Sequence, residues 1–118
     1  MDQFQIRSAE GSAGICILKV IGPLTLANVF DFQNTARNET DRAIIIDLSD
    51  VPFMDSFGLG SILGVFASCQ RTKRGFALAG AASRVRTLLE VAKADRILLV
   101  ADTVENAEAQ LSAKAQQA

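Results

Sequence analysis

Polar residues that could carry out chemistry gather directly after the most apolar run of the chain, residues 43–46. Asp47, Asp50 and Asp55 could together hold a hard cation such as Mg²⁺, which prefers carboxylate oxygens. We favour a second interpretation, in which Asp50 is a turn residue and Asp55 caps a helix, each satisfied by local backbone amides. A small magnesium-dependent phosphatase built on these carboxylates stays a minor alternative, because no base or lysine lies nearby in sequence.

Two glycines, Gly58 and Gly60, follow a strand pattern and open a helix pattern, which is the setting of a phosphate-binding loop. The third glycine of a dinucleotide fingerprint and the lysine of a P-loop are both missing. We therefore interpret the pair as close packing of a helix start against the sheet.

Ser56 stands in the first turn of the same predicted helix, where serine is common without any function. A phosphoryl group there would face the backbone amides of Phe57, Gly58 and Leu59 at the positive end of the helix dipole. It would add about −1.5 to −2 charges beside Asp55, on a surface that otherwise offers Met54 and Phe57 to a partner. We expect phosphorylation to leave the fold intact and to displace a docked partner.

Composition excludes several classes of function. The 118 residues include no histidine, so Ser/His/Asp and Cys/His mechanisms are impossible, and two cysteines alone cannot form a common structural zinc site. A net charge of −1 argues against a nucleic-acid binder held by phosphate contacts. We predict no resident metal or cofactor and no catalysis, and we expect Cys16 and Cys69 to be buried free thiols.

Charge along the second half of the chain is unevenly distributed. From Ser56 to Leu89 every charged residue is basic. Arg71, Lys73 and Arg74 are explained by a helix end, whose dipole favours cations. Arg84 and Arg86 come early in a predicted helix, where cations are unfavourable, and are weak candidates for a partner-facing patch.

The hydropathy pattern predicts a single α/β domain with no direct membrane insertion. No apolar run approaches the ~20 residues of a membrane-spanning helix, and the first residues lack the pattern of a signal peptide. We expect a cytoplasmic protein whose domain spans residues 1–113, with a frayed tail at residues 114–118.

Periodicity gives the element order β-β-α-β-α-β-α-β-α and a mixed, mostly parallel five-stranded sheet with about four helices. The first two strands are expected to pair as an antiparallel hairpin. The predicted strands are residues 4–7, 15–21, 43–48, 76–79 and 96–100. The predicted N-caps are Thr25, Asp55, Ser83 and Thr103, and Gly75 is the predicted left-handed end of the second helix.

The stretch VPFMDSFGLGSILG after IIIDLSD resembles the signature of the STAS domain of bacterial anti-sigma factor antagonists. The resemblance also covers Gly22-Pro23-Leu24 and the segment AASRVRTLLEVAKADRILLV. It implies a non-enzymatic protein that binds an anti-sigma factor, often a GHKL-type serine kinase, and so releases a sigma factor. It further implies that this kinase phosphorylates Ser56, which ends binding, and that a PP2C-type phosphatase reverses the step.

The resemblance implies a partner-binding face made of Pro23, Thr25, Met54, Asp55, Ser56, Phe57 and Gly60. Two departures make this face less polar than is usual in the family. Phe57 replaces the usual serine or threonine after the phosphorylated serine, and Gly22-Pro23-Leu24-Thr25 replaces an acidic G-E-L-D turn. These departures leave room for a second function, that of a non-switching STAS subunit in a lipid-transport or sensory-scaffold complex.

Overall fold

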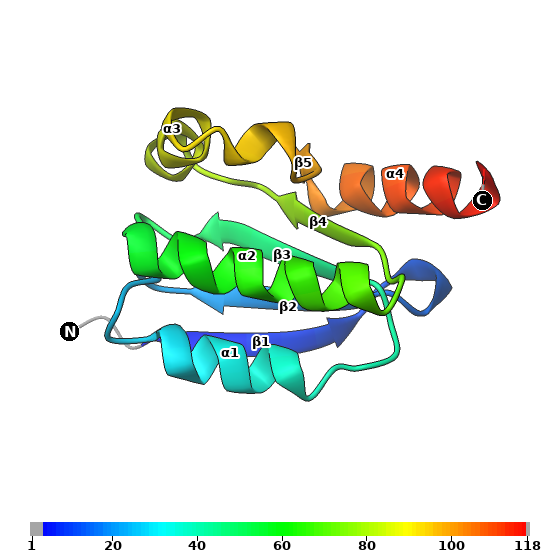
Figure 1. The fold of residues 1–118 in the computed structure, drawn as a ribbon, viewed down its shortest axis with the longest axis horizontal. Helices are drawn as coiled ribbons and strands as arrows, with labels where there is room; N and C mark the ends of the chain where they lie inside the picture. Colours follow the sequence, from blue (N-terminus) through cyan, green and yellow to red (C-terminus); the bar gives the residue numbers. More distant parts are fainter. Residues whose placement is uncertain (1–3, 118) are drawn as a thin grey trace.

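The computed structural model describes residues 4–117 and contains one five-stranded sheet with strand order β1-β2-β3-β4-β5 (Figure 1). Only the first pair is antiparallel, which confirms the predicted hairpin and the mixed, mostly parallel sheet. The elements, in chain order, are β1 (Gln5–Glu10), η1 (Ser12–Gly14), β2 (Cys16–Ile21), α1 (Val29–Arg37), β3 (Ile44–Asp50), α2 (Ser56–Arg71), β4 (Phe76–Ala79), α3 (Ser83–Val91), η2 (Ala94–Arg96), β5 (Val100–Ala101) and α4 (Val104–Gln117).

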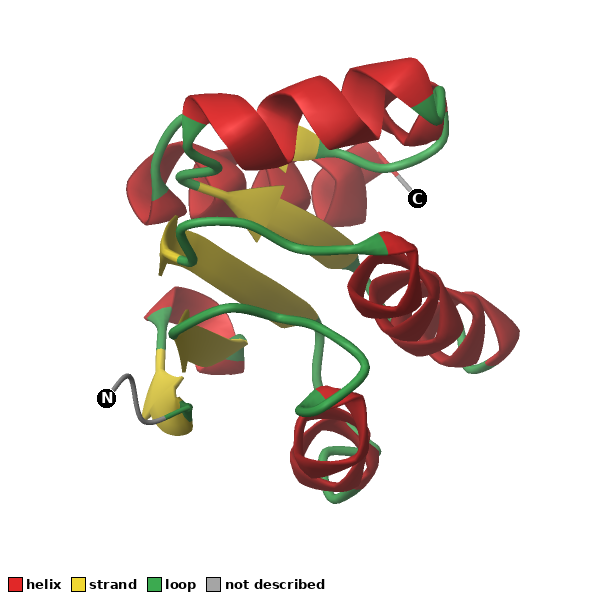
Figure 2. Ribbon diagram, turned by 90° about the vertical axis from the view of Figure 1, so that its left-hand side faces the viewer, coloured by secondary structure: helices red, strands yellow, loops and turns green. Residues whose placement is uncertain are grey.

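Alternate residues of the central strands enter two separate cores, because successive side chains of a strand point to opposite faces. Ile44 and Ile46 of β3 pack with buried residues of α1, α2 and α3, whereas Ile45 packs with Ala107 and Leu111 of α4. Figure 2 looks along α1 and α2, which lie next to each other on one face of the sheet. All three isoleucines are fully buried, so the apolar run predicted to be a buried strand is one.

Three predicted boundaries are wrong, each for a local reason. Residues 25–28 form a turn in which the Thr25 carbonyl accepts from the amides of Asn28 and Val29, so α1 begins at Val29 and Thr25 does not cap it. Ala82, not Ser83, occupies the N-cap position of α3. The left-handed residue after α2 is Lys73 rather than Gly75, and Gly75 instead leaves room for Leu111 of α4.

The fifth strand is shorter than predicted and lies later in the chain. Lys93 adopts a left-handed conformation, and Ala94–Arg96 forms the single 3₁₀ turn η2. The carbonyl of Ala94 then accepts from the amides of Ile97 and Leu98, which keeps these residues out of the sheet. After β5 the chain forms α4, which begins at Val104 and ends at Gln117.

The predicted state of the two cysteines is confirmed. Cys16 and Cys69 are both free and buried, and burial raises the pKa of both thiols.

No helix within residues 4–117 has the length and hydropathy needed to cross a bilayer.

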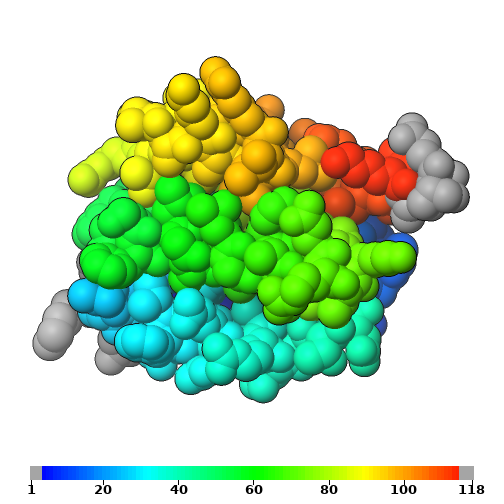
Figure 3. Space-filling model, in the orientation of Figure 1, coloured from blue at the N-terminus to red at the C-terminus, as the bar shows by residue number. Residues whose placement is uncertain are grey.

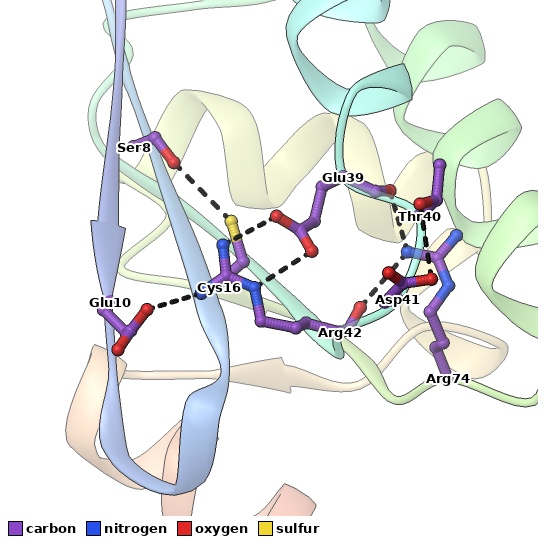
Figure 4. A network of polar contacts seen from close by, with 8 residues as sticks. All are labelled: Ser8, Glu10, Cys16, Glu39, Thr40, Asp41, Arg42 and Arg74. Carbon is purple, nitrogen blue, oxygen red and sulfur yellow. Dashed lines mark hydrogen bonds and ion pairs between the residues drawn. The ribbon is translucent and has the colours of Figure 1, made fainter.

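A polar network joins β1, the loop before β3 and the loop after α2 (Figure 4). Arg42 donates to both carboxylate oxygens of Glu39, at 2.9 and 2.7 Å, and to Glu10 at 2.9 Å. Arg74 donates to the carbonyls of Glu39 and Arg42 at 3.0 and 3.1 Å. The network fixes the chain where it enters the central strand.

The Glu39–Arg42 pair predicts a pH dependence of stability. The hydrogen bonds from Arg42 lower the pKa of the Glu39 carboxyl below its ordinary value. A group whose pKa is lowered by folding stabilises the fold above its unfolded pKa, and this contribution is lost as the pH falls through the folded pKa. We expect Glu39→Gln to lower the urea midpoint at neutral pH. The difference from the parent protein is expected to shrink once the pH falls below the ordinary glutamate pKa of about 4.3 and to vanish below the lowered pKa of the folded state. Asp41→Asn is the control, since among the described residues that exposed carboxylate accepts only from the Thr40 hydroxyl, at 3.4 Å. An undiminished difference at low pH would contradict the prediction.

Candidate functional site

The loops that follow β2 and β3 run side by side at the carboxyl ends of the strands, where open α/β sheets usually carry their sites. The Gly22 amide donates to the Asp50 carbonyl at 3.0 Å, and the Leu24 amide donates to the Phe53 carbonyl at 3.2 Å. Leu24 and Met54 form an isolated parallel bridge. The sheet therefore extends as backbone pairing into the two loops that carry the predicted site residues.

Asp55 connects this loop pair to α2. One carboxylate oxygen accepts from the Gly58 amide at 2.9 Å, which is the N-cap bond of α2, and the other accepts from the Leu26 amide at 3.2 Å. The sequence predicted the cap correctly, but not the second bond. Because both oxygens already accept amide protons, Asp55 acts here as a bridge between two segments.

The other two aspartates are engaged separately. Asp47 accepts from the Ser49 amide at 3.0 Å, and Asp50 lies 3.3 Å from the Lys19 ammonium group. Within residues 4–117, no group of three or more acidic or cysteine side chains is placed to hold a metal ion. The three aspartates therefore do not form the magnesium site of the phosphatase alternative.

Gly58 is a packing glycine, as predicted, whereas Gly60 is not. A β-carbon on Gly58 would overlap the carbonyl oxygen of Leu24 and lie 3.0 Å from its carbonyl carbon. Gly60 is exposed, and no atom lies within 4 Å of the position its β-carbon would take. Glycine at position 58 thus allows the loop after β2, at Leu24, to pack directly on the first turn of α2.

Ser56 is the first residue of α2, and its side chain is exposed. Two of the three amides expected to face a phosphate already have acceptors: Gly58 donates to the Asp55 side chain, and Leu59 donates to the Asp55 carbonyl at 3.0 Å. The Phe57 amide has no acceptor among the described residues. A phosphate on Ser56 would therefore find one free amide at the helix start and the dipole of the whole helix.

The surface around Ser56 is apolar, though not through all the residues the sequence indicated. Met54 is only 8% exposed and belongs to the core, so the expectation that it faces a partner is wrong. Pro23 and Thr25 are half-buried. The exposed apolar side chains of these loops and of the helix starts next to them are Leu26, Phe30, Phe53 and Phe57, at 51%, 69%, 38% and 56%.

Sequence reasoning missed Leu26 and Phe53 as members of this surface. Leu26 precedes α1 by three residues, so its exposure does not follow from the periodicity of that helix. Phe53 lies under the guanidinium of Arg84 from α3, 5.2 Å from the ring centroid. That contact places Arg84 beside the loop after β3, whereas Arg86 is paired with Asp102 at 3.1 Å.

Comparisons with known proteins agree with one another. The family model of the STAS domain matches residues 7–107. A protein of Thermotoga neapolitana named "Putative anti-sigma factor antagonist TM1081 homolog" is 38% identical over 80 residues, which make up 67% of each chain. The crystal structure of TM1081 from Thermotoga maritima, which carries the same designation, has a TM-score of 0.78 at 26% identity and covers 91% of this chain and 94% of that one. An anti-sigma factor antagonist from Mycobacterium paratuberculosis shares the fold, with a TM-score of 0.84 at 17% identity over 94% of this chain and 96% of that one.

The glycine pair yields a prediction about stability. Gly58→Ala is expected to lower the free energy of unfolding by about 2 kcal/mol or more, because backbone must move to admit the methyl group. Gly60→Ala is expected to raise it by about 0.5–1 kcal/mol, because the site has space and alanine is the better helix former. Urea denaturation measures both. Equal stability of the two variants would contradict the packing role of Gly58.

The bridge that Asp55 forms between Gly58 and Leu26 yields a second prediction about stability. Asp55→Ala is expected to cost about 1–2 kcal/mol of unfolding free energy and to speed hydrogen exchange at the Leu26 amide, which loses its acceptor. The control is Asp31→Ala, at an exposed first-turn aspartate of α1 whose carboxylate accepts no hydrogen bond within residues 4–117. That change is expected to cost less than about 0.5 kcal/mol. Unchanged exchange at Leu26 would refute the bridge.

Proposed function

Since the chain belongs to the STAS domain family, we propose that it is an anti-sigma factor antagonist switched by phosphorylation of Ser56. STAS domains of this kind are non-enzymatic regulatory modules. In the unphosphorylated state the protein binds a kinase-type anti-sigma factor and thereby frees a sigma factor. The kinase supplies ATP and Mg²⁺ for the phosphorylation, and a PP2C-type phosphatase restores the binding form in the cytoplasm.

The observation that carries the proposal is the placement of one exposed hydroxyl inside an apolar surface. Ser56 is exposed on the first turn of α2, and Leu26, Phe53 and Phe57 supply exposed apolar area on the segments around it. Apolar side chains of this kind favour contact with a partner. A kinase can reach the hydroxyl without unfolding any part of the domain.

A phosphate on Ser56 has two opposing effects, one on the stability of the fold and one on partner binding. The helix dipole and the free Phe57 amide stabilise a negative charge at this position, so the fold survives. The same charge would stand next to the Asp55 carboxylate, and docking would bury it against the partner. Burying an unpaired charge costs several kcal/mol, so the partner leaves.

A non-switching subunit of a lipid-transport or sensory-scaffold complex is the second candidate. The observation in its favour is Phe57, an apolar side chain that is 56% exposed and would suit a permanent contact. Affinity capture with the full chain distinguishes this candidate from the switching antagonist. Recovery of an ABC transporter ATPase in place of a GHKL-type kinase favours the second candidate.

The switch is tested by measuring how Ser56 variants bind the kinase-type anti-sigma factor that affinity capture with the full chain recovers. Ser56→Ala is expected to bind as the parent protein does, and Ser56→Asp at least about tenfold more weakly, which corresponds to ~1.4 kcal/mol. Isothermal titration calorimetry measures both affinities. Equal affinities of the two variants would refute the switch.

Asn106→Asp is the control. Asn106 is exposed in the first turn of α4, which packs on the other core of the sheet, so a carboxylate there gains helix-dipole stabilisation without charging the surface around Ser56. Its affinity is expected to stay near that of the parent. A comparable loss at position 106 would show that added negative charge, and not the Ser56 site, controls binding.

A further inference from the structure

A groove of about 390 Å³ lies between α1 and α2, toward the carboxyl ends of both helices. Figure 3 shows the face of the molecule on which these two helices are neighbours. We propose that this groove binds a small amphipathic anion, a carboxylate carrying a single apolar chain. The proposal involves α2 from Ser61 onward and none of the residues around Ser56, so it stands apart from the proposed switch.

The floor of the groove is apolar. Ile44 of β3 is fully buried, and Ala36 of α1 and Val65 of α2 are 4% and 9% exposed. Ser61 also lines the groove, but its hydroxyl already donates to the Gly58 carbonyl at 2.7 Å and does not need a ligand as its acceptor. A pocket of this size and lining is typical of small-molecule sites, which lie between about 300 and 1,000 Å³.

Three arginines give the groove a cationic end: Arg37, Arg71 and Arg74. None of them forms a salt bridge within the described part of the chain. Glu39, which lies two residues beyond Arg37, is held by Arg42 (Figure 4). Among the described residues, no carboxylate pairs with the positive charge at this end of the groove.

Arg74 is held in position for such a ligand. Its Nε donates to the Thr72 hydroxyl at 2.7 Å, and its Nη1 donates to the carbonyls of Glu39 and Arg42. Nη2 has no partner among the described residues. A guanidinium fixed in this way binds a carboxylate with little further loss of side-chain freedom.

The helix dipoles explain only part of this arrangement. Arg37 and Arg71 lie in the last turns of α1 and α2, where a cation is stabilising. This effect accounts for the charges, but not for the hollow beside them, which is left open by Gly64. Gly64 is exposed and lies in mid-helix, and no atom lies within 4 Å of the position of its β-carbon. Glycine there costs about 1 kcal/mol relative to alanine without any packing contact that requires it, and its effect is to keep the groove open.

The proposal is tested by titrating the full chain with octanoate and, separately, with 1-octanol, followed by ¹⁵N–¹H NMR. Octanoate is expected to give saturable shifts at the amides of Ala36, Gly64, Ser68 and Arg71, with an affinity about tenfold above that of octanol, because only octanoate makes charge-assisted hydrogen bonds. Equal affinity for the two compounds, or shifts confined to other parts of the molecule, would overturn the proposal.

Two variants locate the site. Gly64→Leu projects a side chain into the groove and is expected to weaken octanoate binding at least tenfold, while its thermal unfolding shows a fold at least as stable as the parent. Ala67→Leu adds an apolar side chain at an exposed position of the same helix that does not line the groove, and is expected to change nothing. Octanoate binding that survives Gly64→Leu would overturn the proposal.

Two further experiments test the role of the arginines and the source of the anion. Arg37→Gln combined with Arg71→Gln is expected to lower the affinity for octanoate but to leave it above that for octanol, because Arg74 stays in place. An unchanged affinity for octanoate would overturn the proposal. Vesicles of phosphatidylglycerol present anionic headgroups on a surface, and the groove is recessed between two helices, so we expect no co-sedimentation. Vesicle binding without octanoate binding would overturn the groove as the site.

Discussion

The carboxylate of Asp55 is shared between two amides that belong to different parts of the chain, Gly58 in the first turn of α2 and Leu26 in the loop after β2. The two apolar cores hold the sheet and helices together and would do so with many residues at position 55. The bridge has a more local effect, since it fixes the loop against the helix start. The placement of the exposed Ser56 and Phe57 near the exposed Leu26 depends on that fixed geometry.

The elements with strong local signals were predictable from the sequence. The alternation of apolar side chains identified the β1–β2 hairpin, the continuous run identified β3, and the caps of α2 and α4 at Asp55 and Thr103 make the expected bonds. Boundaries set by neighbours were not predictable. Thr25 has the chemistry of a cap, but its segment pairs with the loop after β3, and the Asn28 side chain donates to the Pro23 carbonyl at 2.6 Å. A tertiary contact of this kind leaves no mark in local periodicity.

The candidate site also contains residues that a local motif predicts and residues that only tertiary contacts place. Ser56 and its capping neighbour follow from a short contiguous motif, so their arrangement was visible in the sequence. The apolar surface around them is assembled from segments 29 residues apart, joined by the Leu26–Asp55 bond. Sequence reasoning therefore counted Met54 as exposed, although it pairs with Leu24 and is buried in the core. It passed over Phe53, whose ring lies against Arg84 of a separate element, α3.

The two ends of α2 are separated far enough to act independently. From Ser56 to Arg71 the helix rises about 22 Å, whereas salt at physiological strength screens charges beyond roughly 8 Å. A phosphate at the first turn would thus change the potential at the three arginines very little. Coupling between the two ends would require α2 to move as a body, and its sheet-facing side, with Ile62 and Cys69 fully buried, resists such movement. The helix is therefore better described as a rigid support, with the proposed switch at one end and the groove along the other half, than as a path between them.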